Sequence, residues 1–357
     1  MRWDLFCRVI DNHGDLGVCW RLAADLASRG ELVRLWVDDP RALTWMAPHG
    51  APGVSLIHWA EPLPATAPGD VVVEAFGCDP PPAFVAGMAA QSVAPLWINL
   101  EYLSAEPYVD RCHGLPSPQL HGPGAGLTKW FFYPGFTALS GGLLREPDAL
   151  AGAPADWLAA QGVALRDGER RVSLFAYADA PLRELFDRLD SQPTLVLLAA
   201  GVAQAPALAL FDAQRQRGRQ LRAHALPWFD QAGYDQLLRA CDINFARGED
   251  SVVRAMWAGA PFVWQIYAQA DGAHAAKLDA LLEQFTAHAM PALAAEVRTL
   301  WRAWNGLGAW PAALPAALPA ASAWRSLCSA WRQHLAAQDD LCSRLLRFVA
   351  TKREASR

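Results

Sequence analysis

Features that mark nucleic-acid-binding and membrane proteins are missing from this sequence. It has no run of Lys or Arg and no basic tail, and its formal net charge is −5. The charge pattern therefore gives no sign of a nucleic-acid partner. Charged residues interrupt the N-terminal segment early, which is not expected of a signal peptide. The apolar stretches are short and are broken by Pro, Gly or charge, so we expect no membrane-spanning helix and a cytoplasmic location.

The motifs of metal and cofactor sites are missing too. The seven cysteines are an odd number and no two have C-x-x-C spacing, so we expect reduced thiols and neither a zinc site nor a disulfide framework. The chain has no D-x-D motif, no G-x-x-x-x-G-K-[ST] motif, and no G-x-G-x-x-G motif after a strand. We therefore expect no metal ion and no bound cofactor.

Length and composition favour two domains. The chain has 357 residues, which suits two domains better than one, and its 53% apolar residues can form a large core. Apolar strand-like segments alternate with helices or long connections in two successive series, which predicts two α/β halves with parallel sheets. We expect the strands at residues 4–10, 32–37, 54–58, 71–75 and 96–100, and then at 171–177, 194–199, 221–226, 243–246 and 261–265.

The two halves are expected to meet near residues 150–170. We assign residues 1–155 to an N-terminal Rossmann-like domain and 156–322 to a C-terminal one. The Gly- and Pro-rich residues 107–146 are expected to be irregular, and 307–321 to form a loop or short helical turn. Residues 323–357 carry apolar side chains at helical spacing, which predicts a single amphipathic helix that packs back on the N-terminal domain.

A loop at residues 11–17 is the first candidate site. It carries two carboxylates, Asp11 and Asp15, between the first strand and a helix that we expect from Val18. Ligands of parallel α/β sheets bind at the carboxyl ends of the strands, where this loop lies. An Asx turn with a helix N-cap would use the same residue types, and this structural alternative stays open.

A second candidate follows the strand at residues 243–246. Gly248 is followed by Glu249, Asp250 and Ser251, and then by a helix over residues 252–258. Such a helix N-terminus offers N–H groups to an anion such as a diphosphate. Ser251 can add a hydroxyl donor, and the acids can hold ribose or sugar hydroxyls. A capped helix start without a ligand is the alternative.

Two aromatic residues, Phe175 and Tyr177, form the third candidate. They share one face of a strand because alternate residues of a strand point to the same side. They could flank a nucleobase, although plain core packing would use the same residues. His13 is notable among nine histidines only because it lies in the first loop.

With these segments identified, the sequence resembles the bacterial protein-arginine rhamnosyltransferase family EarP. The resemblance covers nearly the whole chain. The matching blocks are WDLFCRVIDN (3–12), GDLGVCWRL (14–22), LPW (226–228) with Gln231 and Tyr234-Asp235, CDINF (241–245), RGEDS (247–251) and WAGAPFVWQIY (257–267).

The resemblance implies a GT-B fold, in which two Rossmann-like domains face each other across a cleft. It implies a metal-independent, inverting transfer of L-rhamnose from dTDP-β-L-rhamnose to an arginine of elongation factor P. That modification activates the factor for rescue of ribosomes stalled at polyproline. The N-terminal domain would hold the acceptor side and the C-terminal domain the donor.

Position by position, Asp11 and Asp15 match the family's catalytic aspartates, and Glu249 matches an essential glutamate. The donor-binding residues expected from the resemblance are Gly14, Phe175, Tyr177, Gln231, Arg247, Asp250, Ser251 and Tyr267. The chain departs from the family at His13, Trp228 and Val252, where Phe is common.

Two other functions are compatible with parts of this pattern. A GT-B transferase that acts on a cell-envelope sugar would share the fold and the diphosphate site, but a sugar hydroxyl needs only one base. A non-catalytic nucleotide-binding protein would need neither Asp11 nor Asp15. The paired carboxylates favour an arginine acceptor, because a carboxylate binds the guanidinium fork in bidentate fashion.

Overall fold

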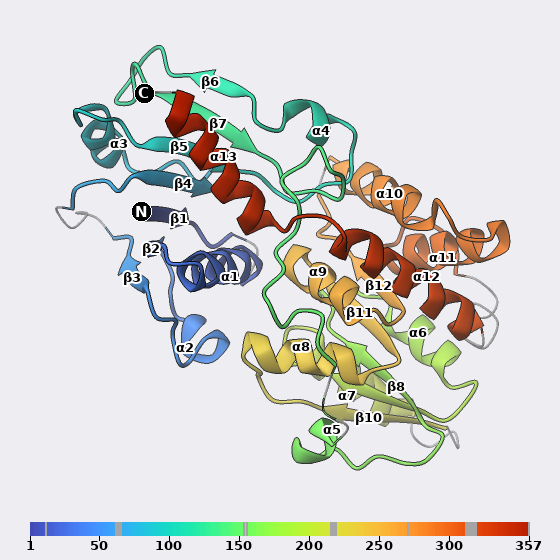
Figure 1. Cartoon of the computed structure of the whole chain (residues 1–357). Helices are drawn as coiled ribbons and strands as arrows, with labels where there is room; N and C mark the ends of the chain where they lie inside the picture. The colour runs from blue at the N-terminus through green and yellow to red at the C-terminus, as the bar shows by residue number, and fades with distance from the viewer. Residues whose placement is uncertain are drawn as a thin grey trace. The chain divides into compact units, whose positions relative to one another are not determined.

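A computed structural model of the chain describes residues 1–10, 13–60, 66–152, 154, 156–214, 220–269, 271–310 and 320–355. These residues form two compact units. The first unit comprises Met1–Glu146 and Ala336–Arg357, and the second unit comprises Pro147–Leu335. Each unit contains one β-sheet with helices packed against it (Figure 1).

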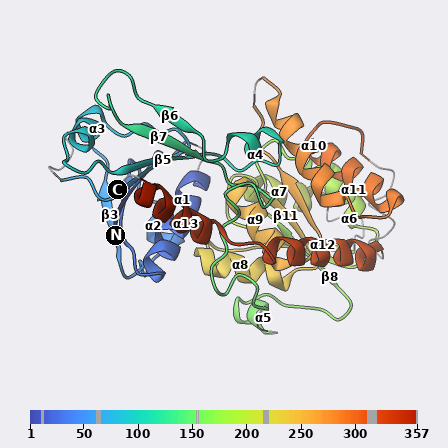
Figure 2. The same ribbon diagram turned by 45° about the horizontal axis from the view of Figure 1, so that its top comes forward.

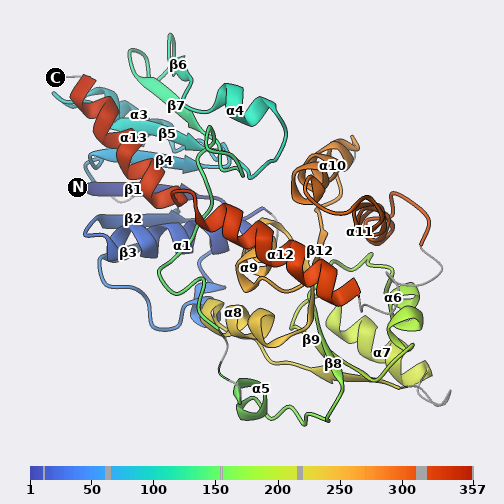
Figure 3. The ribbon, with the colours of Figure 1, turned by 45° about the vertical axis from the view of Figure 1, so that its right-hand side comes forward.

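The first unit is built on a seven-stranded sheet in the order β3-β2-β1-β4-β5-β7-β6. All neighbouring strands run parallel except β6 and β7. Figure 3 shows β2, β1, β4 and β5 side by side. The strands are β1 (Arg2–Cys7), β2 (Leu32–Val37), β3 (Val54–His58), β4 (Val71–Ala75), β5 (Leu96–Leu100), β6 (Pro116–Pro118) and β7 (Thr128–Phe132). The expected bounds of β2 to β5 are confirmed, whereas β1 ends three residues earlier than expected.

Side chains of β1 show that both faces of this sheet are covered. Leu5 and Cys7 join a buried cluster with residues of α1 (Gly14–Ser28) and α13 (Leu341–Ala355), whereas Phe6 joins another with Phe84 of α3. Successive residues of a strand face opposite sides, so a doubly covered sheet needs nearly continuous apolar strands. The other helices of this unit are α2 (Leu43–Met46), α3 (Pro82–Ala89) and α4 (Tyr108–Cys112).

The C-terminal tail forms two helices, where the sequence predicts one. Most of α12 (Ala320–Ala336) belongs to the second unit, while α13 belongs to the first and lies beside α1 (Figure 2). Asp340 separates them because its side chain accepts a hydrogen bond from the Ser343 N–H at 2.8 Å, as an N-cap does. Arg29 donates to both Asp25 and Asp340, which ties the start of α13 to α1.

The second unit is built on a five-stranded parallel sheet in the order β10-β9-β8-β11-β12. Its strands are β8 (Arg170–Leu174), β9 (Thr194–Leu198), β10 (Leu221–Ala225), β11 (Ile243–Arg247) and β12 (Phe262–Gln265). Its other helices are α5 (Trp157–Ala160), α6 (Leu182–Leu189), α7 (Gln204–Gln214), α8 (Gln231–Ala240), α9 (Glu249–Ala258), α10 (Ala273–Thr286) and α11 (Pro291–Trp304).

Each sheet has a point where the strand order reverses. In the first unit the chain moves outward from β1 through β2 to β3, then returns to β4 on the other side of β1. In the second unit it moves from β8 through β9 to β10 and returns to β11. Connections leave in opposite directions at such switch points, which opens a crevice at the carboxyl ends of the two central strands. The expected ligand sites therefore lie after β1 and β4, and after β8 and β11.

The expected α/β class with parallel sheets is confirmed. The segment 107–146, expected to be irregular, contains β6 and β7, which close one side of the first sheet. Residues 311–319, the middle of the tract expected to be a loop, lie outside the described residues, and α12 already begins at Ala320. Within the described ranges, every helix is too short or too polar to cross a bilayer.

Candidate functional site

Asp15 lies in the first turn of α1, at the switch point of the first unit. The helix follows the carboxyl end of β1, and only 4% of the Asp15 surface is exposed. One of its carboxylate oxygens, Oδ2, accepts a hydrogen bond from the Ile10 N–H at 3.0 Å. The helix dipole and this main-chain donor both stabilise a negative charge at this position. Asp15 is therefore held in place at this edge of the sheet, where its carboxylate can accept a proton or bind a cation.

The rest of the first loop is described only in part. Asp11, the expected partner of Asp15, lies outside the described residues, as does Asn12. His13 precedes α1, and its ring packs edge-on against Trp45 with centroids 5.6 Å apart. Gly14 is the first residue of α1 and is half-buried.

Arg247 is the centre of the candidate site in the second unit. It ends β11 with only 7% of its surface exposed. Its guanidinium carbon lies 4.4 Å from the ring centroid of Phe175 and 4.7 Å from that of Tyr177. Both aromatic residues follow the carboxyl end of β8. These contacts are cation–π interactions, and they place a permanent positive charge at the switch point between β8 and β11.

The first turn of α9 continues this site. Gly248 precedes the helix with a φ of +70°, a conformation that a residue with a Cβ rarely adopts. Glu249, Asp250 and Ser251 form the first helical turn, and Ser251 is 9% exposed. The N–H groups at the start of a helix point outward and attract anions. Together with Arg247, they make this edge of the second sheet suitable for a diphosphate.

Glu249 has a cationic neighbour that the sequence did not suggest. Nζ of Lys277 lies 2.5 Å from Oε1 of Glu249, and about four-fifths of each side chain is covered. Lys277 comes from α10, 28 residues further along the chain. No local motif surrounds Lys277, so its pairing with Glu249 becomes evident only from the packing of α10 within the second unit.

Gln265 is a second residue that sequence reasoning missed. It ends β12 and is 4% exposed. Its Oε1 accepts a hydrogen bond from the Tyr177 N–H at 2.8 Å, so it fixes the backbone that carries the aromatic ring. Tyr267, two residues later, packs edge-on against Tyr177 with ring centroids 5.7 Å apart. A buried amide at the end of an apolar strand was the available signal.

Helix α8 brings Gln231 to the same edge of the sheet. Gln231 is its first residue, and Asp230 caps it by accepting a hydrogen bond from the Gly233 N–H at 2.7 Å. One turn later, Tyr234 packs edge-on against Phe175 with ring centroids 5.7 Å apart. Burial raises the pKa of the Tyr234 hydroxyl, which therefore stays protonated. The donor-binding residues expected in the second unit thus all lie at or just after the carboxyl ends of its strands, or at the starts of α8 and α9.

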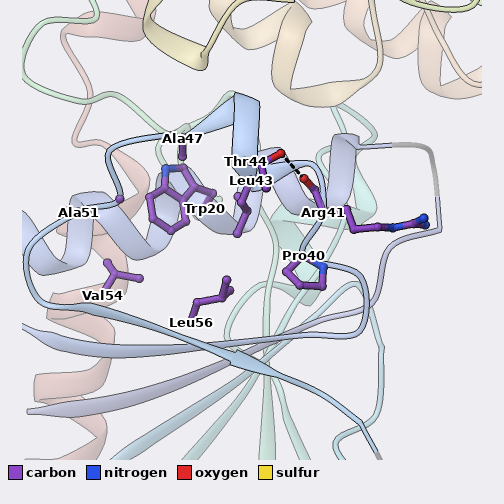
Figure 4. A pocket seen from close by; sticks show the side chains of 10 residues that line it. Trp20, Pro40, Arg41, Leu43, Thr44, Ala47, Ala51, Val54 and Leu56 are labelled. Carbon is purple, nitrogen blue, oxygen red and sulfur yellow. Dashed lines mark hydrogen bonds between the residues drawn. The ribbon is translucent and has the colours of Figure 1, made fainter.

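An apolar pocket of about 490 Å³ lies elsewhere in the first unit, between α1, α2 and β3 (Figure 4). Trp20, Leu43, Val54 and Leu56 line it, and none of the expected site residues that the structure describes is among its lining residues. The pocket is therefore separate from the candidate site.

Asp25, Asp340 and Cys342 form a cluster whose ligand atoms lie within 4.8 Å of one another. Such a cluster could in principle hold a cation. However, Arg29 donates to both carboxylates, with N–O distances of 2.8 to 3.0 Å. The guanidinium thus already balances this charge, and the cluster is a structural ion pair that joins α1 to α13.

Comparison with known proteins agrees with this geometry. Residues 3–350 match the family model described as elongation factor P (EF-P) rhamnosyltransferase EarP. The chain is 41% identical to the protein-arginine rhamnosyltransferase of Pseudomonas aeruginosa, over 98% of both chains. It is 43% identical to that of Pseudomonas putida, over 97% of this chain and 98% of the relative.

A solved structure shows the same architecture. It is described as the structural basis for EarP-mediated arginine glycosylation of translation elongation factor EF-P. It aligns with a TM-score of 0.64 and 29% identity over 98% of this chain and 99% of that one. The two parallel-sheet units thus form a GT-B fold, and the chain is an enzyme of the glycosyltransferase class, a member of the EarP family.

Proposed function

We propose that the chain transfers L-rhamnose from dTDP-β-L-rhamnose to an arginine side chain of elongation factor P. The transfer proceeds with inversion and without a metal ion, in the cytoplasm, and it activates the factor for rescue of ribosomes stalled at polyproline. Family membership supports the reaction. The observation that carries the chemistry is the buried Asp15 carboxylate at the switch point of the first unit.

The acceptor explains why a fixed carboxylate is needed. A guanidinium is cationic and planar, and it is a poor nucleophile because its lone pairs are delocalised; its pKa exceeds 12. Asp15 holds one edge of it and serves as the general base, with Asp11 as the orienting partner. As the nitrogen attacks the anomeric carbon, a new C–N bond forms, the C–O bond to the diphosphate breaks, and the proton on nitrogen passes to Asp15.

The second unit would bind the donor. Phe175 and Tyr177 flank the base, and the first turn of α9 receives the diphosphate, with Ser251 adding a hydroxyl donor. Arg247 brings a positive charge near the leaving group, where negative charge grows as the C–O bond breaks. Gln231, Asp250 and Tyr267 complete the donor site at the same edge, and Gly14 at the start of α1 is a further donor-binding residue expected from the family. Glu249 positions the sugar, and Lys277 holds Glu249.

Intact mass spectrometry tests this function. Unmodified elongation factor P from the source organism is incubated with the enzyme and dTDP-L-rhamnose. The expected result is a gain of one deoxyhexose, which is lost when the acceptor arginine is replaced by lysine. If no mass is gained while calorimetry shows dTDP binding, the arginine acceptor is wrong. The fold would then serve another acceptor, such as a cell-envelope sugar.

A further inference from the structure

A strained aromatic residue lies beside the switch point of the first unit. Phe76 directly follows β4 and has a φ of +59°. Among the described residues, only Phe76 and Asp79 combine a positive φ with a side chain larger than hydrogen. This conformation is unusual for a bulky aromatic residue, and such outliers persist where the surrounding structure holds them in place.

Two contacts hold Phe76 in this conformation. Its N–H donates a hydrogen bond to the Leu100 carbonyl oxygen at 2.6 Å. Its ring stacks on the ring of Tyr102, with centroids 4.4 Å apart and an interplanar angle of 15°. The strained backbone thus aims the Phe76 ring flat against Tyr102, which lies two residues beyond the end of β5.

A hydrogen-bond chain fixes the neighbouring loop as well. The Gly77 N–H donates to Oδ1 of Asn99 at 3.2 Å, and Nδ2 of Asn99 donates to Oε1 of Glu101 at 2.8 Å. The segment that follows β4 is therefore joined to the end of β5 by main-chain and side-chain hydrogen bonds, and Asn99 in turn holds Glu101 just after β5. Tyr102 is presented on a rigid base and is still 37% exposed.

The sheet register places this stack next to the loop that carries Asp15. Phe6 of β1 pairs with Glu74 of β4, and Ala75 of β4 pairs with Leu100 of β5, so the three strands end nearly level. Neighbouring strands lie about 4.8 Å apart. Phe76 also packs against the buried cluster that contains Leu16 of α1. The Phe76–Tyr102 stack therefore belongs to the same carboxyl edge as Asp15.

We propose that Tyr102, backed by Phe76, is the surface on which the acceptor guanidinium stacks, and that it selects arginine over lysine. The inference rests on the proposed function and names a specificity-determining residue for it. A guanidinium is flat, delocalised and weakly hydrated, so it stacks well on an aromatic face, whereas an ammonium is a compact, strongly hydrated charge. Carboxylates attract both the guanidinium and the ammonium, but an aromatic ring face favours the planar guanidinium.

The test compares Tyr102→Leu with Tyr102→Phe, using elongation factor P as acceptor. Tyr102→Leu removes the π face and should raise the KM for the acceptor about tenfold, while Tyr102→Phe keeps the face and should stay within twofold. The affinity for dTDP should not change in either variant. An acceptor KM that is unaltered in Tyr102→Leu, or raised equally in both variants, would overturn the proposal.

Phe76→Gly separates recognition from folding. Glycine accepts the positive φ without strain, but the variant loses the packing of the ring against the core and gains freedom in the unfolded chain. Thermal unfolding therefore shows by how much its stability falls and that it is folded at the assay temperature. The variant should raise the acceptor KM, because Tyr102 loses its support. Lower stability with an unchanged acceptor KM would mean that the stack serves only the fold.

Calorimetric binding of the acceptor protein keeps the two hypotheses apart. If the wild type binds elongation factor P and transfers no sugar, the proposed function fails, and the role of Tyr102 is judged by whether Tyr102→Leu weakens that binding. If transfer occurs and Tyr102→Leu binds and turns over as the wild type does, only the stacking proposal fails.

Discussion

Arg254 of α9 forms a two-pronged ion pair with Asp235 of α8, with N–O distances of 3.0 and 2.6 Å, and both side chains are more than nine-tenths buried. The pair joins the helix that begins with Gln231 to the helix that begins with Glu249. It thus fixes the two helix starts relative to each other at the edge of the second sheet.

Breaking that pair should destabilise the second unit. Asp235→Asn leaves a buried guanidinium without its counter-charge, and the free energy of unfolding should fall by about 3 kcal/mol. Urea unfolding measures this change. Asp279→Asn is the matched control, because its partner Arg302 and Asp279 itself are 39% and 47% exposed. The control should cost less than about 1 kcal/mol; equal effects would contradict a special role for the buried pair.

Asp15→Asn should nearly abolish transfer. The amide keeps the shape of the carboxylate and loses its charge and basicity, so kcat should fall about 10²- to 10⁴-fold, the usual worth of a general base. Calorimetric affinity for dTDP should be retained. Asp39→Asn serves as control, because Asp39 is a partly exposed aspartate beyond β2 that binds Arg41. A variant at position 15 that turns over normally would remove the proposed base.

Ser251→Ala should weaken dTDP binding. The loss of one hydroxyl donor at the start of α9 should raise the Kd about fivefold, which corresponds to about 1 kcal/mol. Calorimetry with dTDP alone measures it without any acceptor. Ser326→Ala removes an exposed hydroxyl that bonds only within α12, and it should leave the Kd unchanged. Unchanged affinity in Ser251→Ala would argue against the diphosphate placement.

Lys277→Gln should lower kcat by removing the ion pair that holds Glu249. Misplacement of a positioning group by about 1 Å can lower the rate about a hundredfold. Lys277→Arg keeps the charge and should recover part of the rate, with a smaller effect on the KM for dTDP-rhamnose. If glutamine and arginine variants behave alike, the charge on Lys277 is not what positions Glu249.

His113 should make the first unit sensitive to acid. Burial lowers the pKa of this imidazole from 6.5 to about 4, and its Nδ1 accepts a hydrogen bond from the Tyr133 N–H. Below pH 6.5 the unfolded chain takes up a proton that the folded protein does not. The contribution of His113 to the free energy of unfolding should therefore be fully present above pH 6.5 and should be lost as the pH drops towards 4.

A pair of variants checks this pH dependence. In His113→Gln, the urea midpoint should change less between pH 7 and pH 4.5 than it does in the wild type, whatever the absolute stability of the variant. His121→Gln, at an exposed position, should follow the wild-type slope. Parallel slopes in all three proteins would show that His113 does not contribute.

The most accurately predicted strands are those whose sequences are incompatible with most other local structures. β2, β4 and β5 are short, mostly apolar runs with a charged residue, Gly or Pro within two residues of each end, and their ends match the expected bounds. Helix α1 begins at Gly14, whereas the sequence predicts a start at Val18. The first turn was missed because it is mostly polar and shows no apolar residues at helical spacing. β7 was missed because its aromatic residues sit in a Gly- and Pro-rich segment, where local signals favour turns.

Some features of the C-terminal tail and of the candidate site could not be predicted from sequence patterns. Apolar residues recur at helical spacing on both sides of Asp340, so the sequence predicts one helix. Asp340 instead acts as an N-cap and divides the tail into α12 and α13. Candidate site residues were found because they cluster in short motifs after strands. Lys277 has no such motif, and the left-handed backbone of Phe76 has no signature in a residue type that rarely adopts it.

The assignment of α13 to the first unit has a consequence for biosynthesis. Leu341, Cys342, Leu345 and Val349 fill the same core as β1 and α1, yet they leave the ribosome last. The nascent first sheet must wait, with the part of its apolar face that α13 covers still exposed, while the whole second unit is translated and can fold. The unit that starts the chain is therefore completed last, and C-terminal truncation should damage the fold of the N-terminal half.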